Sequence, residues 1–89
     1  MSSVLVKNSA AFSETTIDGE VVVMSLDTGT FYSLTGSAAA TWALIDGTRD
    51  YTALLDDLAA HFKTSPSLIG ADTDAFIKSL VEAGLIAGG

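Results

Sequence analysis

The 89-residue sequence contains no cysteine, one proline and only four Lys and Arg residues. Without cysteine it can form neither a disulfide framework nor a thiolate metal site. Eleven acidic residues outnumber the four basic ones, and the net charge is −7. Nucleic-acid binding requires a basic surface for phosphate contacts, so we expect no nucleic-acid partner. The charge instead favours solubility and a basic or neutral partner.

Long apolar runs are also missing. No segment approaches the ~18 apolar residues of a membrane span, and the N-terminal residues lack the charged and apolar regions of a signal peptide. Hydrophobic residues nevertheless make up 48% of the chain, which argues against disorder. We therefore expect one soluble, cytoplasmic domain over residues 1–89, with no membrane partner.

The first third of the sequence has the pattern of antiparallel strands. Strands are predicted over residues 11–17, 20–26 and 30–34, joined by turns at Asp18-Gly19 and at 27–29. Alternation divides the second strand into two faces, one with Val22, Met24 and Leu26 and the other with Val21, Val23 and Ser25. The third strand is expected at an edge, where its backbone groups are unpaired.

Three helices are predicted after the strands, over residues 36–46, 51–62 and 66–83. Each follows a residue that favours an N-cap, and Pro66 suits the first turn of the last helix. The three predicted caps are Thr35, Asp50 and Ser65. The core-facing residues are expected to be Ala39, Trp42, Ile45, Tyr51, Leu54, Leu55, Leu58, Phe62, Ile69, Thr73, Phe76, Ile77 and Leu80. The fold class is thus α+β, a winged helix-turn-helix-like arrangement of order β-β-β-α-α-α.

Residues able to perform chemistry are few. Asp57 and His61 are four positions apart on a helix, a spacing that suits an acid–base dyad, half a metal site or an ordinary surface pair. The surface pair is the most common of these arrangements. No nucleophile or phosphate-binding motif occurs. We predict no catalytic residue, no metal site and no cofactor, and hence that the protein is not an enzyme.

An ordered motif spans the last strand and the first helix. It reads acidic–x–Gly–x–aromatic–aromatic–x–Leu, then a small-residue helix with a tryptophan, then Asp-Gly. Its positions are Asp27, Gly29, Phe31, Tyr32, Leu34, Trp42, Asp46 and Gly47.

A second motif lies in the last helix and continues to the apolar residues after it. Its positions are Asp72, Thr73, Phe76, Ile77, Leu80, Gly84, Leu85 and Ile86, with Thr73 in place of the usual valine. Together the two motifs resemble those of the PqqD-like family, over residues 12 to 86. That family comprises peptide chaperones and precursor-recognition domains of ribosomal peptide biosynthesis, and the first motif is slightly closer to its lasso-peptide members.

The resemblance implies a function in peptide binding. Members bind the leader segment of a precursor peptide as an extra antiparallel strand on the third strand, with apolar side chains in a groove beside the third helix. A separate protease, cyclase or radical enzyme then acts on the peptide. Carried over to this sequence, the peptide-binding residues are Thr30, Phe31, Tyr32, Ser33, Leu34, Asp72, Ala75, Phe76 and Ser79. Tyr32 and Leu34 are expected mainly in the core and Phe31 nearer the leader.

Other interpretations remain open. A winged-helix transcription factor shares the expected topology, although Asp72, Asp74 and Glu82 make its third helix unsuited to DNA. The terminal Gly88-Gly89 is typical of ubiquitin-like and sulfur-carrier proteins, but it is also an ordinary chain end. A homodimer that pairs two edge strands is a further partner prediction.

Overall fold

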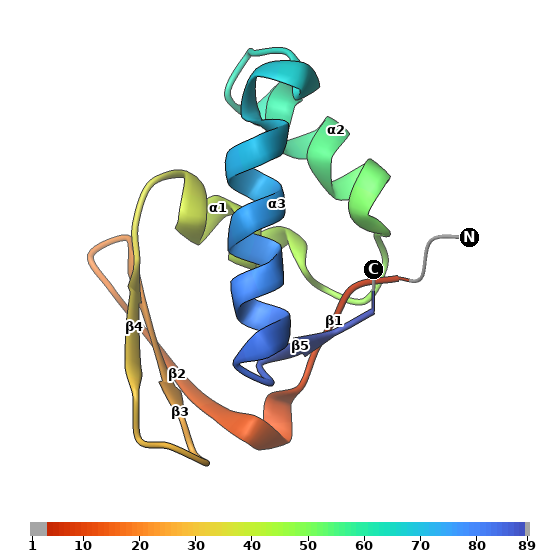
Figure 1. Cartoon of the computed structure of the whole chain (residues 1–89). Coiled ribbons are helices and arrows are strands. Elements are labelled where there is room, and N and C mark those ends of the chain that lie inside the picture. Colours follow the sequence, from red (N-terminus) through yellow and green to blue (C-terminus); the bar gives the residue numbers. More distant parts are fainter. Residues whose placement is uncertain (1–3, 89) are drawn as a thin grey trace.

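The computed structural model describes residues 4–88. Its main sheet has three antiparallel strands in the order β2-β3-β4, and three helices follow (Figure 1). The strand bounds are β2 Phe12–Ile17, β3 Glu20–Ser25 and β4 Phe31–Leu34, and the helix bounds are α1 Ser37–Leu44, α2 Tyr51–His61 and α3 Pro66–Glu82. The predicted α+β fold is therefore confirmed, and β4 is at an edge as expected.

Three short elements were not predicted. β1 (Val6–Lys7) pairs antiparallel with β5 (Ile86–Ala87), which joins the two ends of the described chain, and a short 3-10 turn, Ser9–Ala11, precedes β2. The pairing buries Leu5 and Ile86. The pairing also holds β5, which directly precedes the terminal Gly88-Gly89 pair, against β1. Gly89 itself lies outside the described residues.

The tight turns of the sheet use residues with positive φ. Asp18 and Gly19 have φ of 50° and 81° in the β2–β3 turn, and Gly29 has φ of 74° before β4. Glycine adopts positive φ without steric cost, and aspartate tolerates it better than most residues do. These turns set the registers of the two strand pairs: Thr15 of β2 lies opposite Val22 of β3, and Met24 of β3 lies opposite Phe31 of β4.

The helix starts match the sequence at two of three positions. The Asp50 carboxylate accepts the Ala53 N–H at 2.8 Å, and the Ser65 hydroxyl accepts the Ser67 N–H at 3.3 Å. The prediction of Thr35 as N-cap of α1 was wrong. Gly36 occupies that position without a side-chain bond, and Thr35 contributes its carbonyl, which accepts the Ala38 N–H at 3.1 Å.

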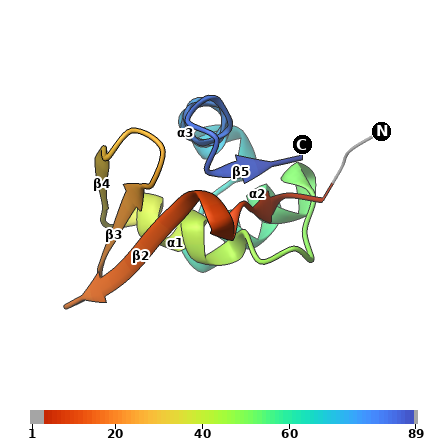
Figure 2. The ribbon, with the colours of Figure 1, turned by 90° about the horizontal axis from the view of Figure 1, so that it is seen from below.

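The core lies between one face of the sheet and the helices (Figure 2). Val21, Val23 and Ser25 of β3 are buried on that face, and Trp42 of α1 is 1% exposed beneath it. The Phe12 ring packs edge-on against Trp42, with centroids 5.1 Å apart. The other large core residues are Leu5, Leu34, Ile45, Leu54, Leu58, Ile77, Leu80, Leu85 and Ile86. Within residues 4–88, none of the helices has the length and apolar character that crossing a membrane requires.

Candidate functional site

The free edge of β4 is the first part of the site. The Ser25 N–H donates to the Thr30 carbonyl at 2.8 Å, which fixes the alternation of the ladder between β3 and β4. Backbone groups of successive residues in a strand point to opposite edges. Tyr32 and Leu34 therefore bond to β3, whereas Phe31 and Ser33 direct their N–H and C=O groups toward the free edge.

The side chains of β4 alternate as the sequence predicted. Leu34 is 5% exposed and Tyr32 is half-buried against the core, whereas the Phe31 ring is 68% exposed and lies opposite Met24. The Ser33 hydroxyl bonds to the Glu20 carboxylate, and the Thr30 hydroxyl to that of Thr28 at 2.8 Å. No residue of β4 is itself charged, and the Glu20 carboxylate from β3 contacts the strand at Ser33.

One face of α3 forms the second part. Asp72, Ala75, Phe76 and Ser79 are spaced three or four residues apart, which aligns them along the helix. Phe76 is half-buried and packs on the same core as Tyr32, while the other three are exposed. In Figure 2, α3 and β4 lie on the same side of the molecule, and β2 lies on the opposite side of the sheet. The structure thus brings the two sets of predicted residues to one side.

A pocket of about 220 Å³ lies between the three helices, near the point where β4 leads into α1. Phe76 and Asp72 belong to its lining, and Asp72 is the only charged residue there. Ala75, Ser79 and the β4 residues do not line this pocket. The other lining residues are Ser37, Ala38, Thr41, Leu58, Phe62, Ile69 and Thr73.

Apart from Asp72 and Phe76, the residues that line the pocket were not predicted as part of the site. Leu58, Phe62 and Ile69 were assigned to the core by helical periodicity, but Phe62 remains 44% exposed at the pocket. Only the apolar stripe signalled them, and such a stripe does not distinguish a core residue from one that lines a pocket.

The charge on the sheet is of one sign. Residues 12–34 contain four acidic and no basic residues, and between Lys7 and Arg49 the chain has no Lys or Arg at all. Lys78 is paired with Asp74 at 3.1 Å. The surroundings of β4 are therefore suited to a peptide with Lys or Arg beside its apolar residues.

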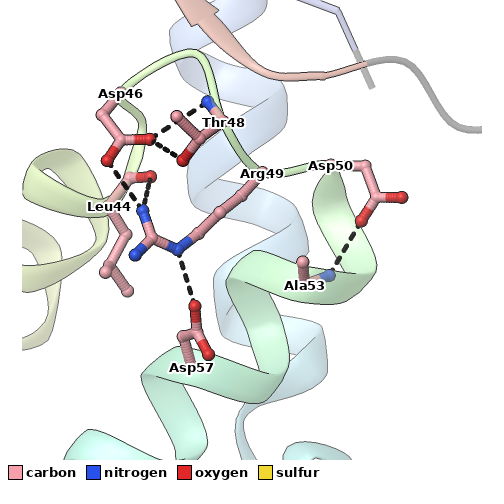
Figure 3. A network of polar contacts seen from close by, with 7 residues as sticks. All are labelled: Leu44, Asp46, Thr48, Arg49, Asp50, Ala53 and Asp57. Atoms are coloured by element: carbon pink, nitrogen blue, oxygen red, sulfur yellow. Dashed lines mark hydrogen bonds and ion pairs between the residues drawn. The ribbon is translucent and has the colours of Figure 1, made fainter.

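A network of polar contacts lies in the connection between α1 and α2 (Figure 3). The Arg49 guanidinium contacts Asp46 at 2.9 Å and Asp57 at 2.6 Å, and donates to the Leu44 carbonyl. The hydrogen bonds that Arg49 donates to Asp57 and Asp46 raise the pKa of Arg49. Hydrogen bonds donated by the Thr48 hydroxyl and by Arg49 lower the pKa of Asp46. The network fixes the connection between the two helices.

The network also includes Asp57, one of the two residues whose spacing suits an acid–base dyad. Asp57, which was weighed as the partner of His61, binds Arg49, and the His61 ring packs edge-on to Phe62 with centroids 4.8 Å apart. Burial raises the pKa of Tyr51, whose hydroxyl donates to the Gly70 carbonyl at 3.2 Å between α2 and α3. These groups serve contacts between and along helices.

Comparison with known proteins adds two matches to this geometry. The solved structure described as TbiB1 in complex with the TbiA(beta) leader peptide superposes with a TM-score of 0.80 and 26% identity, over 94% of this chain and 98% of that one. No curated protein sequence matches the chain. The family described as coenzyme PQQ synthesis protein D (PqqD) matches residues 20–86, which include β4, α3 and the pocket between the helices. Since that match covers most of the chain, the protein belongs to the PqqD family, as a PqqD-like recognition element of ribosomal peptide biosynthesis.

Proposed function

We propose that the protein binds the leader segment of a ribosomally made precursor peptide and delivers it to a separate modifying or processing enzyme. The observation that carries this proposal is the free edge of β4, uncharged and on the same side of the molecule as the exposed face of α3. The structural relative, which was solved with a leader peptide, supports the same assignment.

Strand addition accounts for the residues at the edge. An antiparallel leader would bond to the outward N–H and C=O groups of Phe31 and Ser33, which supplies affinity without reading sequence. Leader residues opposite Tyr32 would point to the inner side of the sheet, because opposite residues of two strands share a face. There they would meet Phe76 and its neighbours Ala75 and Ser79.

The direction of the leader follows from that of β4. Since β4 runs toward α1 and the pocket at its start, the N-terminal end of an antiparallel leader would lie beside the pocket. An apolar leader residue there would contact Phe76, and a nearby Lys or Arg would pair with Asp72. Specificity then lies in these side chains and in the exposed Thr30 and Phe31.

The experiment is a fluorescence-polarisation titration with labelled leader peptides from small reading frames beside the gene, lasso-type leaders first. We expect one leader to bind with micromolar or tighter affinity, equivalent to ~8 kcal/mol or more. A scrambled leader of the same composition is the control. If no leader from the neighbourhood binds better than its scrambled form, the proposal fails.

A further inference from the structure

The outer face of the main sheet, opposite the core, carries a group of apolar side chains among the polar side chains of Ser13, Thr15, Glu20 and Ser33. The registers place Ile17 of β2, Val22 and Met24 of β3, and Phe31 of β4 on this face. Ile17 is 57% exposed and Phe31 68%, and Leu26, directly after β3, is 57% exposed. These five residues, which we call the outer patch, account for three of the large exposed hydrophobic side chains in the described part of the chain.

The helices leave this patch open. All three described helices lie on the core side of the sheet in Figures 1 and 2. Asp18 lies at one end of the patch and Asp27 at the other, and Glu20 lies on the same face opposite Ile17, with its carboxylate accepting the Ser33 hydroxyl. Exposed apolar surface rimmed by charge is typical of a docking site, and here the rim is of one sign.

The patch is also continuous with the leader-binding edge. Leader residues opposite Phe31 and Ser33 would lie on the outer face, because opposite residues in an antiparallel pair share a face. The added strand would therefore widen the apolar surface next to Phe31. One set of leader side chains would face α3 and the alternate set would remain accessible from outside.

We propose that the outer patch docks the enzyme that modifies the bound peptide, through an apolar surface bordered by Lys or Arg. The enzyme would contact the patch and the outward leader residues together, so it would bind the leader complex more tightly than the free protein. This inference rests on the proposed leader binding and adds the surface and the chemistry of the partner.

A second copy of the chain fits the patch less well. Two patches face to face would bring Asp18, Glu20 and Asp27 of both copies close together, and residues 8–48 contain no Lys or Arg to compensate. Like charges across an interface oppose association. A partner with a basic rim has the complementary charge.

The test uses Val22→Lys, at the centre of the patch, and Ala60→Lys, an exposed position on α2, as the control with the same change in charge. Ile17→Lys is a second variant at an exposed position, in case Val22→Lys unfolds. Leader affinity is measured by fluorescence polarisation. Binding of each purified candidate enzyme encoded near the gene is measured by biolayer interferometry, with and without saturating leader.

We expect all three variants to bind leader within about 2-fold of wild type, because Ile17 and Ala60 lie away from the edge of β4 and Val22, opposite Ser33, is separated from the added leader by β4 itself. One enzyme should bind the wild-type leader complex at least about 5-fold more tightly than the free protein, and Val22→Lys should weaken that binding by about 10-fold or more. Added salt should weaken it further, since the rim is charged. Ala60→Lys should behave as wild type.

Three outcomes would overturn the inference while leaving leader binding intact. One is equal enzyme binding by wild type, Val22→Lys and Ile17→Lys. Another is that no candidate enzyme binds the leader complex. The third is a dimer mass by light scattering that Val22→Lys converts to a monomer, which would assign the patch to a second copy. Loss of leader binding by wild type itself would instead refute the proposed function.

Discussion

The two edges of the main sheet differ in charge. On β2 the Glu14 side chain points to the core side and accepts the Trp42 indole N–H at 3.0 Å, and the Lys7 ammonium lies 4.6 Å from the centre of the same ring. On β4 no residue is charged. The β2 edge therefore carries an inward carboxylate beside the core. At the β4 edge the nearest carboxylate, that of Glu20 on β3, bonds to Ser33 on the outer face, and the inner face carries no charge from β4.

Inward-pointing charge is a common device that protects an edge strand from pairing with another chain. On β2 the residues with outward backbone groups are Glu14 and Thr16, since Ser13, Thr15 and Ile17 pair with β3 in the alternate positions. An incoming strand there would meet the Glu14 carboxylate. On β4 the corresponding residues, Phe31 and Ser33, have no inward charge beside them, because the Glu20 carboxylate that accepts the Ser33 hydroxyl lies on the outer face. The difference supports the proposal that a leader adds to β4 and not to β2.

The largest expected effect comes from proline at the two edges. Ser33→Pro removes an N–H that faces the free edge of β4, and Thr16→Pro removes the equivalent N–H on β2. Neither substitution breaks a bond within the sheet. Ser33→Pro should weaken leader binding by about 10-fold or more, since it removes a hydrogen bond and adds a ring at the contact. Thr16→Pro should leave the affinity within about 2-fold, by fluorescence polarisation.

Ser33→Ala is the matched control for the proline variant. It removes the hydroxyl that bonds to Glu20 but keeps the backbone N–H. Its affinity should remain near that of wild type. Equal losses for Ser33→Pro and Thr16→Pro, with native circular dichroism in both, would be incompatible with a difference between the edges.

The next largest effect on leader affinity is expected when a negative charge is introduced at the β4 edge, with the same change at the β2 edge for comparison. Phe31→Asp places a carboxylate beside the bound leader, whereas Ile17→Asp places one on the same face at the β2 edge. We expect a loss of about 1–2 kcal/mol in leader binding for Phe31→Asp, from lost apolar contact and an added charge. Isothermal titration calorimetry measures it. An equal loss for Ile17→Asp would show that the leader does not distinguish the edges.

The third largest effect on leader binding is expected from a change in α3, which lies on the side of the β4 edge and not of the β2 edge. Phe76→Ala removes a half-buried ring that lines the pocket and packs on the core. Leader affinity should fall about 5-fold and the free energy of unfolding by about 1–2 kcal/mol, less than for a fully buried ring. Asp72→Asn, at the exposed rim, is the control for stability. Unchanged affinity in Phe76→Ala would exclude a contact between the leader and this part of α3.

A smaller effect is expected from removing the charge that protects β2. Glu14→Val loses the bond from Trp42 and should lower the free energy of unfolding by about 1 kcal/mol. Glu14→Gln keeps an acceptor and should lose less. Urea denaturation followed by the emission of Trp42, the only tryptophan, measures both. If Glu14→Val were as stable as wild type, the bond to Trp42 would contribute nothing.

The smallest effect lies away from both edges, in the network of Figure 3. The pKa of Asp46 is lowered from 3.8, so its contribution to stability is present above pH 3.8 and is lost as the pH falls through the lower folded value. Acid denaturation of Asp46→Asn should therefore depend less on pH below 3.8 than that of wild type. Leader affinity near neutral pH should be the same in both.

Local signals in the sequence predicted the hairpins and two helix starts. Asp18-Gly19 dictates a tight turn, and Asp50 and Ser65 satisfy N–H groups within three residues of themselves. β1 and β5 were missed because each has two residues and their pairing joins Val6 to Ala87 and Lys7 to Ile86, at opposite ends of the chain, which no periodic pattern records. Thr35 failed as a cap because Gly36, with φ of 57°, takes the turn into α1.

The candidate site was predictable from the sequence only in part. Alternation placed Phe31 outward and Leu34 inward, because a strand at an edge with one buried face leaves no other arrangement. The protective position of Glu14 depends on Trp42, 28 residues away, and on Lys7. Such a contact between distant parts of the chain is set by packing. The difference between the β2 and β4 edges therefore could not be predicted from the sequence and is seen only in the structure.

The most direct test of the account is backbone amide exchange measured by NMR, with and without a saturating leader peptide. Addition of leader should slow exchange of the Phe31 and Ser33 N–H groups, while those of Glu14 and Thr16 remain unchanged. Protection of Glu14 and Thr16, or of neither pair despite saturable binding, would contradict strand addition at β4.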